Sequence, residues 1–184
     1  MLATRGIAWT ADDMELLEDF PDGYRYEASG GVLEVTPPPT DFHDEFAELL
    51  REQLFGQRGS EWNVRLTPAV GTATGWRIPD LAVIRRATPL SRAPGARPAT
   101  AFGLVVEVAS PSSHHRDRVV KRGEYAEVGI PYFWLVETEP DLIVIAHELR
   151  GSSYVETARL TSGTAELPGP FAAVVDLEGL RPVE

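Results

Sequence analysis

The sequence predicts an α/β (α+β) fold in which helices flank a mixed β-sheet, with a helix and a hairpin at the N-terminus. Short runs rich in β-branched residues recur along the chain, bounded by glycines and prolines. Segments with apolar side chains at helical spacing interrupt these runs. A chain of 184 residues can bury one sizeable core, and we therefore expect a single domain over residues 1–184.

The N-terminal part combines two helices with a hairpin. Residues 10–20 begin with a threonine before acidic residues and an apolar stripe, which predicts a short capped helix that ends near Pro21. Residues 24–38 predict two strands joined at Ser29-Gly30-Gly31. Residues 40–59 then predict a longer helix, capped by Thr40 or Asp41, whose apolar positions are Phe42, Phe46, Leu49, Leu50 and Leu54.

The middle of the chain predicts strands separated by a long loop. Three segments are rich in β-branched residues and bounded by Gly or Pro, namely residues 61–70, 76–86 and 102–110. The segment 87–101 between the second and third is dense in Pro, Ala and Arg and has no apolar periodicity. It is therefore expected to be a surface loop.

The C-terminal part begins with a helix over residues 113–128, which stops at Gly129. Residues 131–138 then predict a buried strand, and residues 141–160 predict a hairpin. A last short segment follows at residues 171–180. This order of elements is typical of a mixed sheet with helices packed on it.

Composition excludes several classes of function. The absence of cysteine excludes disulfides, thiolate catalysis and Cys-based metal centres, so that any metal must be held by oxygen or imidazole ligands. The net charge of −11 argues against non-specific coating of nucleic acid, although residues 84–97 and 114–122 are locally basic. No apolar run of membrane-spanning length and no signal-type segment is present, and we expect a cytoplasmic protein without membrane contact.

Two predicted strands each carry a carboxylate where burial would be costly. Glu107 lies between valines, and Asp80 follows Pro79 at the start of an apolar run. A buried charge must be paired or must coordinate a metal, and neighbouring strands could bring the two carboxylates together. An alternative interpretation has Asp80 capping a turn after Pro79, and Glu107 paired with Arg77 or Arg116.

The following helix carries a set of polar residues on one face. Asp117, Lys121 and Tyr125 are spaced by four residues. Lys121 is the only lysine among 17 lysines and arginines. Because lysine and arginine are chemically distinct, this indicates a lysine with a specific task, and chance is the alternative.

Taken in order, these residues resemble the Uma-type restriction endonucleases of the PD-(D/E)xK nuclease superfamily. The resemblance spans roughly residues 10–150. Its motifs are Tyr26-Glu27, Gly30-Gly31, the TPPP run, His43, Pro79-Asp80, the segment EVASPS from Glu107, Asp117, Lys121, Tyr125 and the segment GIPYFWLV from Gly129. One position departs from the superfamily pattern: Ala109 stands two residues after the strand glutamate, where the superfamily has lysine. In this family the lysine is supplied by the next helix, at the place of Lys121.

The resemblance implies a restriction-endonuclease-like fold and a metal-dependent endonuclease that hydrolyses phosphodiester bonds in DNA. Asp80, Glu107 and Lys121 would be the catalytic residues. Mg²⁺, or Mn²⁺ in its place, would be held by Asp80, Glu107 and the carbonyl of Val108. Glu27 is a further candidate ligand, and its alternative interpretation is a surface carboxylate of the hairpin.

Supporting roles fall to His43, Ser110, Asp117 and Tyr125. His43 could approach the same site from the start of its helix, or it could simply cap or pack. The resemblance also implies DNA as a partner and a second copy of the chain in a homodimer. The residues leave open whether the substrate is duplex DNA, single-stranded or branched nucleic acid, or RNA.

Two other classes of function compete with the nuclease. One is a catalytically silent binding or regulatory module with the same fold, which the charge of −11 favours. The other is a structural homo-oligomer. The presence of Asp80, Glu107 and Lys121 weighs against both, because neither class has a chemical reason to keep them.

Overall fold

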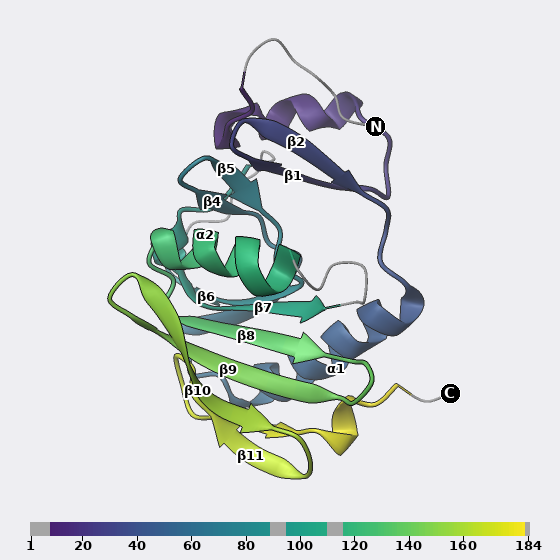
Figure 1. The fold of residues 1–184 in the computed structure, drawn as a ribbon, viewed down its shortest axis with the longest axis vertical. Helices are drawn as coiled ribbons and strands as arrows, with labels where there is room; N and C mark the ends of the chain where they lie inside the picture. Colours follow the sequence, from purple (N-terminus) through teal and green to yellow (C-terminus); the bar gives the residue numbers. More distant parts are fainter. Residues whose placement is uncertain (1–7, 89–94, 110–115, 183–184) are drawn as a thin grey trace.

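A six-stranded mixed sheet forms the centre of the computed structural model (Figure 1). The structure describes residues 8–88, 95–109 and 116–182, and for residues 116–118 it describes the backbone alone. The strand order is β10-β9-β8-β7-β6-β3. Strands β7 and β8 are parallel and the other neighbours are antiparallel, which confirms the predicted mixed sheet. The strands are β3 (Trp62–Leu66), β6 (Leu81–Arg85), β7 (Phe102–Ala109), β8 (Tyr132–Glu137), β9 (Ile143–Arg150) and β10 (Ser153–Leu160).

Helices cover both faces of this sheet. Helix α1 (Asp41–Gln57) begins at Thr40, whose side chain accepts a hydrogen bond from the backbone of His43, and it packs Phe46, Leu50 and Leu54 on one face. The two-stranded sheet of β11 (Thr164–Leu167) and β12 (Ala173–Asp176) packs in the same apolar cluster, together with the 3-10 turn η4 (Glu178–Leu180).

The other face is covered by a helix that changes type along its length. It runs as a π-helix, η3 (Arg116–Lys121), and continues as α2 (Arg122–Glu127), which lies over this face (Figure 1). Helix α2 buries Tyr125 and Ala126. The end at Gly129, with a φ of 77°, agrees with the predicted stop. The first residues of the predicted helix, 113–115, lie outside the described residues.

A second, four-stranded sheet of order β2-β1-β5-β4 lies beside α2 at one end of the molecule (Figure 1). Its strands are β1 (Arg25–Ser29), β2 (Val32–Thr36), β4 (Val70–Thr72) and β5 (Gly75–Arg77). The predicted hairpin is confirmed, with Gly30 and Gly31 at positive φ in the turn. The predicted first helix is a 3-10 helix, η1 (Ala11–Asp19), with the side chain of Asp13 accepting from the backbone of Thr10.

Two segments that the sequence predicts as single strands are each divided between the two sheets. Residues 61–70 break at Thr67, which has a φ of 45°, so that β3 joins the large sheet and β4 the small one. Residues 76–86 break around Pro79, which has no backbone N–H to pair. Asp80 therefore stands at the point where the chain enters β6 from the small sheet.

The remaining elements follow the expectations with small differences. The C-terminal hairpin of β9 and β10 turns at Gly151, as predicted. Phe42, expected on the apolar stripe of its helix, is 53% exposed because it lies in the first turn, beyond the edge of the core. The predicted loop 87–101 ends in a short 3-10 turn, η2 (Ala99–Ala101). Within the described ranges, no helix is both long and apolar enough to cross a membrane.

Candidate functional site

The two strand carboxylates lie next to each other at the centre of the large sheet. In the antiparallel pair β6 and β7, Leu81 is opposite Val106, so that the residue before Leu81 meets the end of β7. The Oδ2 atom of Asp80 accepts a hydrogen bond from the backbone N–H of Val108 at 2.8 Å. Asp80 is 3% exposed and Glu107 is 1% exposed. The predicted convergence of these strands thus occurs, with both carboxylates buried.

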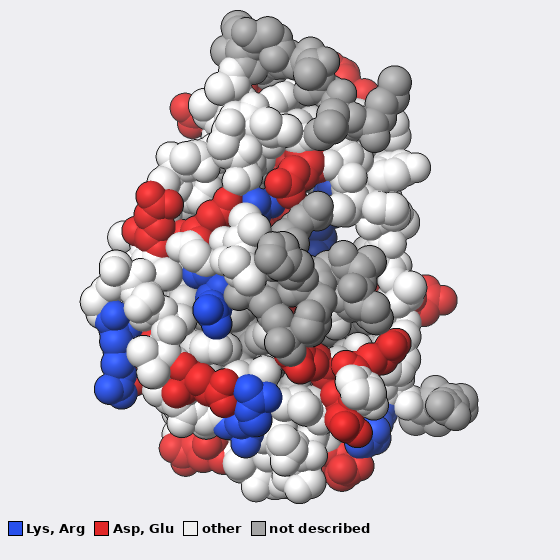
Figure 2. All heavy atoms as spheres, in the orientation of Figure 1, with Lys and Arg blue, Asp and Glu red and all other residues white. Residues whose placement is uncertain are grey.

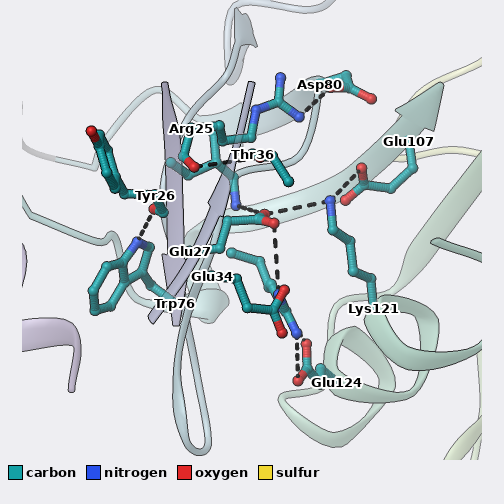
Figure 3. A network of polar contacts seen from close by, with 12 residues as sticks. Arg25, Tyr26, Glu27, Glu34, Thr36, Trp76, Asp80, Glu107, Lys121 and Glu124 are labelled. Atoms are coloured by element: carbon teal, nitrogen blue, oxygen red, sulfur yellow. Dashed lines mark hydrogen bonds and ion pairs between the residues drawn. The ribbon is translucent and has the colours of Figure 1, made fainter. Parts of the chain in front are cut away.

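Lys121 reaches the same place from the helix that covers this face. Its Nζ atom is 3.0 Å from Oε2 of Glu107 and 3.4 Å from Oε1 of Glu27 (Figure 3). One turn later, the hydroxyl of Tyr125 donates to Oε1 of Glu107 at 2.6 Å. Both residues therefore hold Glu107 from one helical face, as their spacing predicts. The lone lysine is buried and forms an ion pair with each of two carboxylates.

Glu27 belongs to this cluster, and its interpretation as a surface carboxylate of the hairpin is wrong. Its side chain is 2% exposed, because β1 faces the large sheet and the helix instead of solvent. It accepts a hydrogen bond from the backbone of Ile78 at 2.7 Å, in addition to its contact with Lys121. Glu27 thus connects the small sheet to the segment that leads into Asp80.

His43 approaches Asp80 from the first turn of α1. Its Nε2 atom is 3.2 Å from Oδ2 of Asp80. Burial works to lower the pKa of His43, but the hydrogen bond and charge of Asp80 outweigh it, and the pKa is raised. Burial likewise works to raise the pKa of Asp80, yet His43 and Arg25 hold that pKa well below its ordinary value. Asp80 is therefore ionised across the ordinary pH range.

Two arginines of this site are not predicted as site residues from the sequence. Arg25 on β1 contacts Oδ1 of Asp80 through its guanidinium at 2.7 Å. Its pKa is raised, because the charge and hydrogen bond of Asp80 outweigh the lowering effect of burial. The signal that could have found it is local: Arg25 and Glu27 are two residues apart on one strand and therefore share a face.

Arg77, the second of these arginines, ties three elements together. It is fully buried, and its guanidinium contacts Glu124 of α2 at 2.5 Å and Glu34 of β2 at 2.9 Å. Its pKa is raised, because these carboxylates outweigh the effect of burial. The alternative pairing of Glu107 with Arg77 is therefore wrong, since Lys121 takes that place.

The remaining candidates lie outside the part of the chain that the structure describes in full. Ser110 is not among the described residues, and the side chains of Arg116 and Asp117 are not described either. Their predicted roles stay predictions.

The charge and chemistry of the described cluster fit a divalent cation. Five carboxylates in it (Glu27, Glu34, Asp80, Glu107 and Glu124) face the three cations Arg25, Arg77 and Lys121. The formal charge is then −2 before His43 is counted, and carboxylate oxygens are the ligands that Mg²⁺ prefers. Among the described residues, however, no three acidic or histidine side chains are already arranged around one point. Metal binding would therefore require Arg25 or Lys121 to shift away from the carboxylate that it holds.

Solvent reaches Asp80 through a pocket of about 280 Å³. Its polar lining consists of Arg25, His43, Asp44, Glu48, Thr67 and Asp80. On the face of the molecule that Figure 2 shows, acidic and basic side chains lie side by side. The site is thus a polar cavity with both signs of charge.

The model of a known protein family matches most of the chain. Residues 11–175 match the model of the Uma2 family, which is described as "Putative restriction endonuclease". The chain belongs to the Uma2 family. The resemblance seen in the motifs is thereby confirmed. The Uma2 match includes β1 with Glu27, the α1 turn with His43, both strand carboxylates and Lys121.

A solved structure shares the fold of this Uma2 chain. It is a crystal structure from Anabaena variabilis, titled as a putative nuclease, with 16% sequence identity and a TM-score of 0.70. The similarity covers 93% of this chain and 96% of that chain. This confirms the predicted nuclease-type fold. No curated protein matches the chain significantly.

Proposed function

We propose that this Uma2 chain is a metal-dependent endonuclease that hydrolyses phosphodiester bonds in DNA. One observation carries the proposal: Asp80, Glu107 and Lys121 meet in one buried cluster, and Asp80 also lines a pocket open to solvent. Membership of a family described as restriction endonucleases supports nuclease activity in general.

The residues of the cluster divide the work. Asp80 and Glu107, with Glu27 and the carbonyl of Val108, would hold Mg²⁺ or Mn²⁺. The bound cation would supply positive charge that polarises the phosphoryl group and makes a bound water more acidic. Lys121 would orient the attacking water or neutralise charge that develops on the phosphate. Tyr125 fixes the position of Glu107.

Arg25 and His43 extend the site toward solvent. Both line the pocket beside Asp80 and could donate hydrogen bonds to a phosphate there, while the exposed carboxylates of Asp44 and Glu48 line the same pocket. A guanidinium suits this task because its planar fork matches two phosphate oxygens. The pocket thus offers two donor groups beside Asp80 within a lining of mixed charge.

Asp80→Asn is expected to weaken Mn²⁺ binding at least tenfold, because it removes the charge of one proposed ligand. Isothermal titration of the full chain measures this directly, and supercoiled plasmid with Mg²⁺ reports the cleavage rate in parallel. Asp141→Asn, at an exposed position, is the matched control and keeps both values. Wild-type Mn²⁺ affinity in Asp80→Asn would contradict the proposed site. A binding module without catalysis would leave plasmid uncut by every variant.

We also propose that the chain acts as a homodimer. Two copies place two sites on the two strands of a duplex, and symmetric pairing enlarges the contact surface of a short chain. Light scattering is expected to give about twice the chain mass of 20.2 kDa. A mass of one chain throughout the micromolar range would contradict this.

A further inference from the structure

A second pocket of about 310 Å³ lies at the β3 edge of the large sheet and is lined by arginines. Four of them surround it: Arg65 on β3, Arg85 and Arg86 at the end of β6, and Arg97 near β4. Asn63 and Thr88 add neutral polar groups. No described lining residue is acidic, although the whole chain carries a net charge of −11. Positive charge is therefore concentrated here against the overall composition.

Three of the four pocket arginines are not neutralised in the way that other surface arginines are. Arg150 and Arg159 on the C-terminal hairpin each contact a nearby glutamate. By contrast, Arg65, Arg85 and Arg86 form no ion pair with any carboxylate of the described residues. The guanidinium of Arg85 lies 4.8 Å from the centre of the Trp62 ring, which holds it in place without cancelling its charge. These groups are available to an anion from solvent.

Arg65 of the arginine pocket lies on the same face of the large sheet as Glu107. Arg65 is opposite Ala82 on β6, and Ala82 is opposite Val105 on β7. Val105 and Glu107 share a face because they are two residues apart on one strand. Asp80 is two residues from Ala82, and so Arg65 is displaced from it by about 7 Å along the strands and about 5 Å across them. Ile84 and Arg86 of the same pocket lie four and six residues beyond Asp80, about 13–20 Å along the strand. These separations correspond to several phosphates of one nucleic-acid strand, which lie about 3.4 Å apart along the axis.

We propose that the arginine pocket binds backbone phosphates of the nucleic acid whose scissile bond lies at Asp80 and Glu107, which rests on the function proposed above. One guanidinium group can donate two parallel hydrogen bonds to two oxygens of a phosphate. Amide and hydroxyl side chains, such as those of Asn63 and Thr88, commonly add further phosphate contacts. No aromatic side chain is among the described lining residues, whereas four guanidinium groups and two neutral polar side chains are, which favours phosphate oxygens as the ligand. The ligand that this lining fits best is therefore a phosphate backbone.

The test compares two double variants with equal changes in charge. Arg65→Gln with Arg86→Gln removes two pocket arginines, and Arg150→Gln with Arg159→Gln removes two arginines of the distant hairpin. Fluorescence anisotropy of a short labelled DNA duplex, with EDTA present to prevent cleavage, measures affinity at several salt concentrations. The pocket variant is expected to bind about tenfold or more weakly, with its salt slope reduced by about 2 if each arginine contacts one phosphate. The hairpin variant keeps the wild-type affinity and slope.

Several outcomes decide the proposal. If both double variants bind the duplex equally weakly, the effect is one of general charge and the proposal is overturned. Wild-type duplex affinity in the pocket variant would also overturn the proposal. Loss of orthophosphate binding with unchanged duplex binding would assign the pocket to a small anion instead. If the double pocket variant melts at a lower temperature than the wild type, the single variant Arg86→Gln, at an exposed position, gives the same comparison with a smaller loss. Pocket-dependent duplex binding without any cleavage in Mg²⁺ would refute the nuclease function while supporting this pocket.

Discussion

Replacing Lys121 by alanine is expected to reduce plasmid cleavage in Mg²⁺ by roughly 100- to 1000-fold, the usual effect of removing one charge-stabilising group from an active site. Lys121 is the only lysine of the chain and lies 3.0 Å from Glu107. Lys121→Arg is expected to restore little activity, because a guanidinium is larger and planar and keeps its proton. Initial rates of supercoiled DNA nicking measure all variants.

The same substitution has a second readout that separates catalysis from folding. Without Lys121, Glu27 and Glu107 remain buried and lose the cation that they share. The melting temperature of Lys121→Ala is therefore expected to fall in EDTA and to rise on adding Mn²⁺ by more than that of the wild type. Arg122→Ala, one residue further along the helix, is the matched control and keeps the wild-type rate. Wild-type cleavage by Lys121→Ala would refute the proposed role of the lysine.

Arg77→Met is expected to lower the free energy of unfolding by about 3–5 kcal/mol, the usual cost of breaking a buried ion pair on one side. The substitution keeps an unbranched side chain but leaves Glu34 and Glu124 without the guanidinium that contacts both. Urea denaturation followed by circular dichroism measures the change. Because Arg77 joins the small sheet to α2, the loss is expected to include the packing between them.

An exposed ion pair provides the control for Arg77. Arg159 contacts Glu156 on the surface of β10, and such pairs contribute at most about 1 kcal/mol. Arg159→Met should therefore leave the urea midpoint nearly unchanged. If Arg77→Met proved no more destabilising than Arg159→Met, the buried network would not be what fixes the small sheet against the helix.

The local elements of this protein follow from the sequence, because their causes are local. Gly30 and Gly31 permit the tight turn of the hairpin, Thr40 caps α1, and Gly129 ends α2. A proline without a backbone N–H also marked the start of β6, which placed Asp80 at a strand entry. The predictions of single strands over residues 61–70 and 76–86 were wrong. The chain turns at Thr67 and at Pro79, and the parts on either side pair in different sheets, which only the tertiary structure shows.

The candidate site divides in the same way. Asp80, Glu107 and Lys121 could be predicted, because a carboxylate in an apolar strand and a solitary lysine are anomalies visible in the sequence. Arg25 and Arg77 are ordinary arginines until the fold buries them, and Arg25 meets Asp80 across 55 residues of chain. The arginine pocket likewise gathers side chains from three separate segments. Sequence determined which charges are unusual, whereas tertiary structure decided which charges meet, because burial removes water and makes each buried charge depend on partners that the fold brings from distant segments.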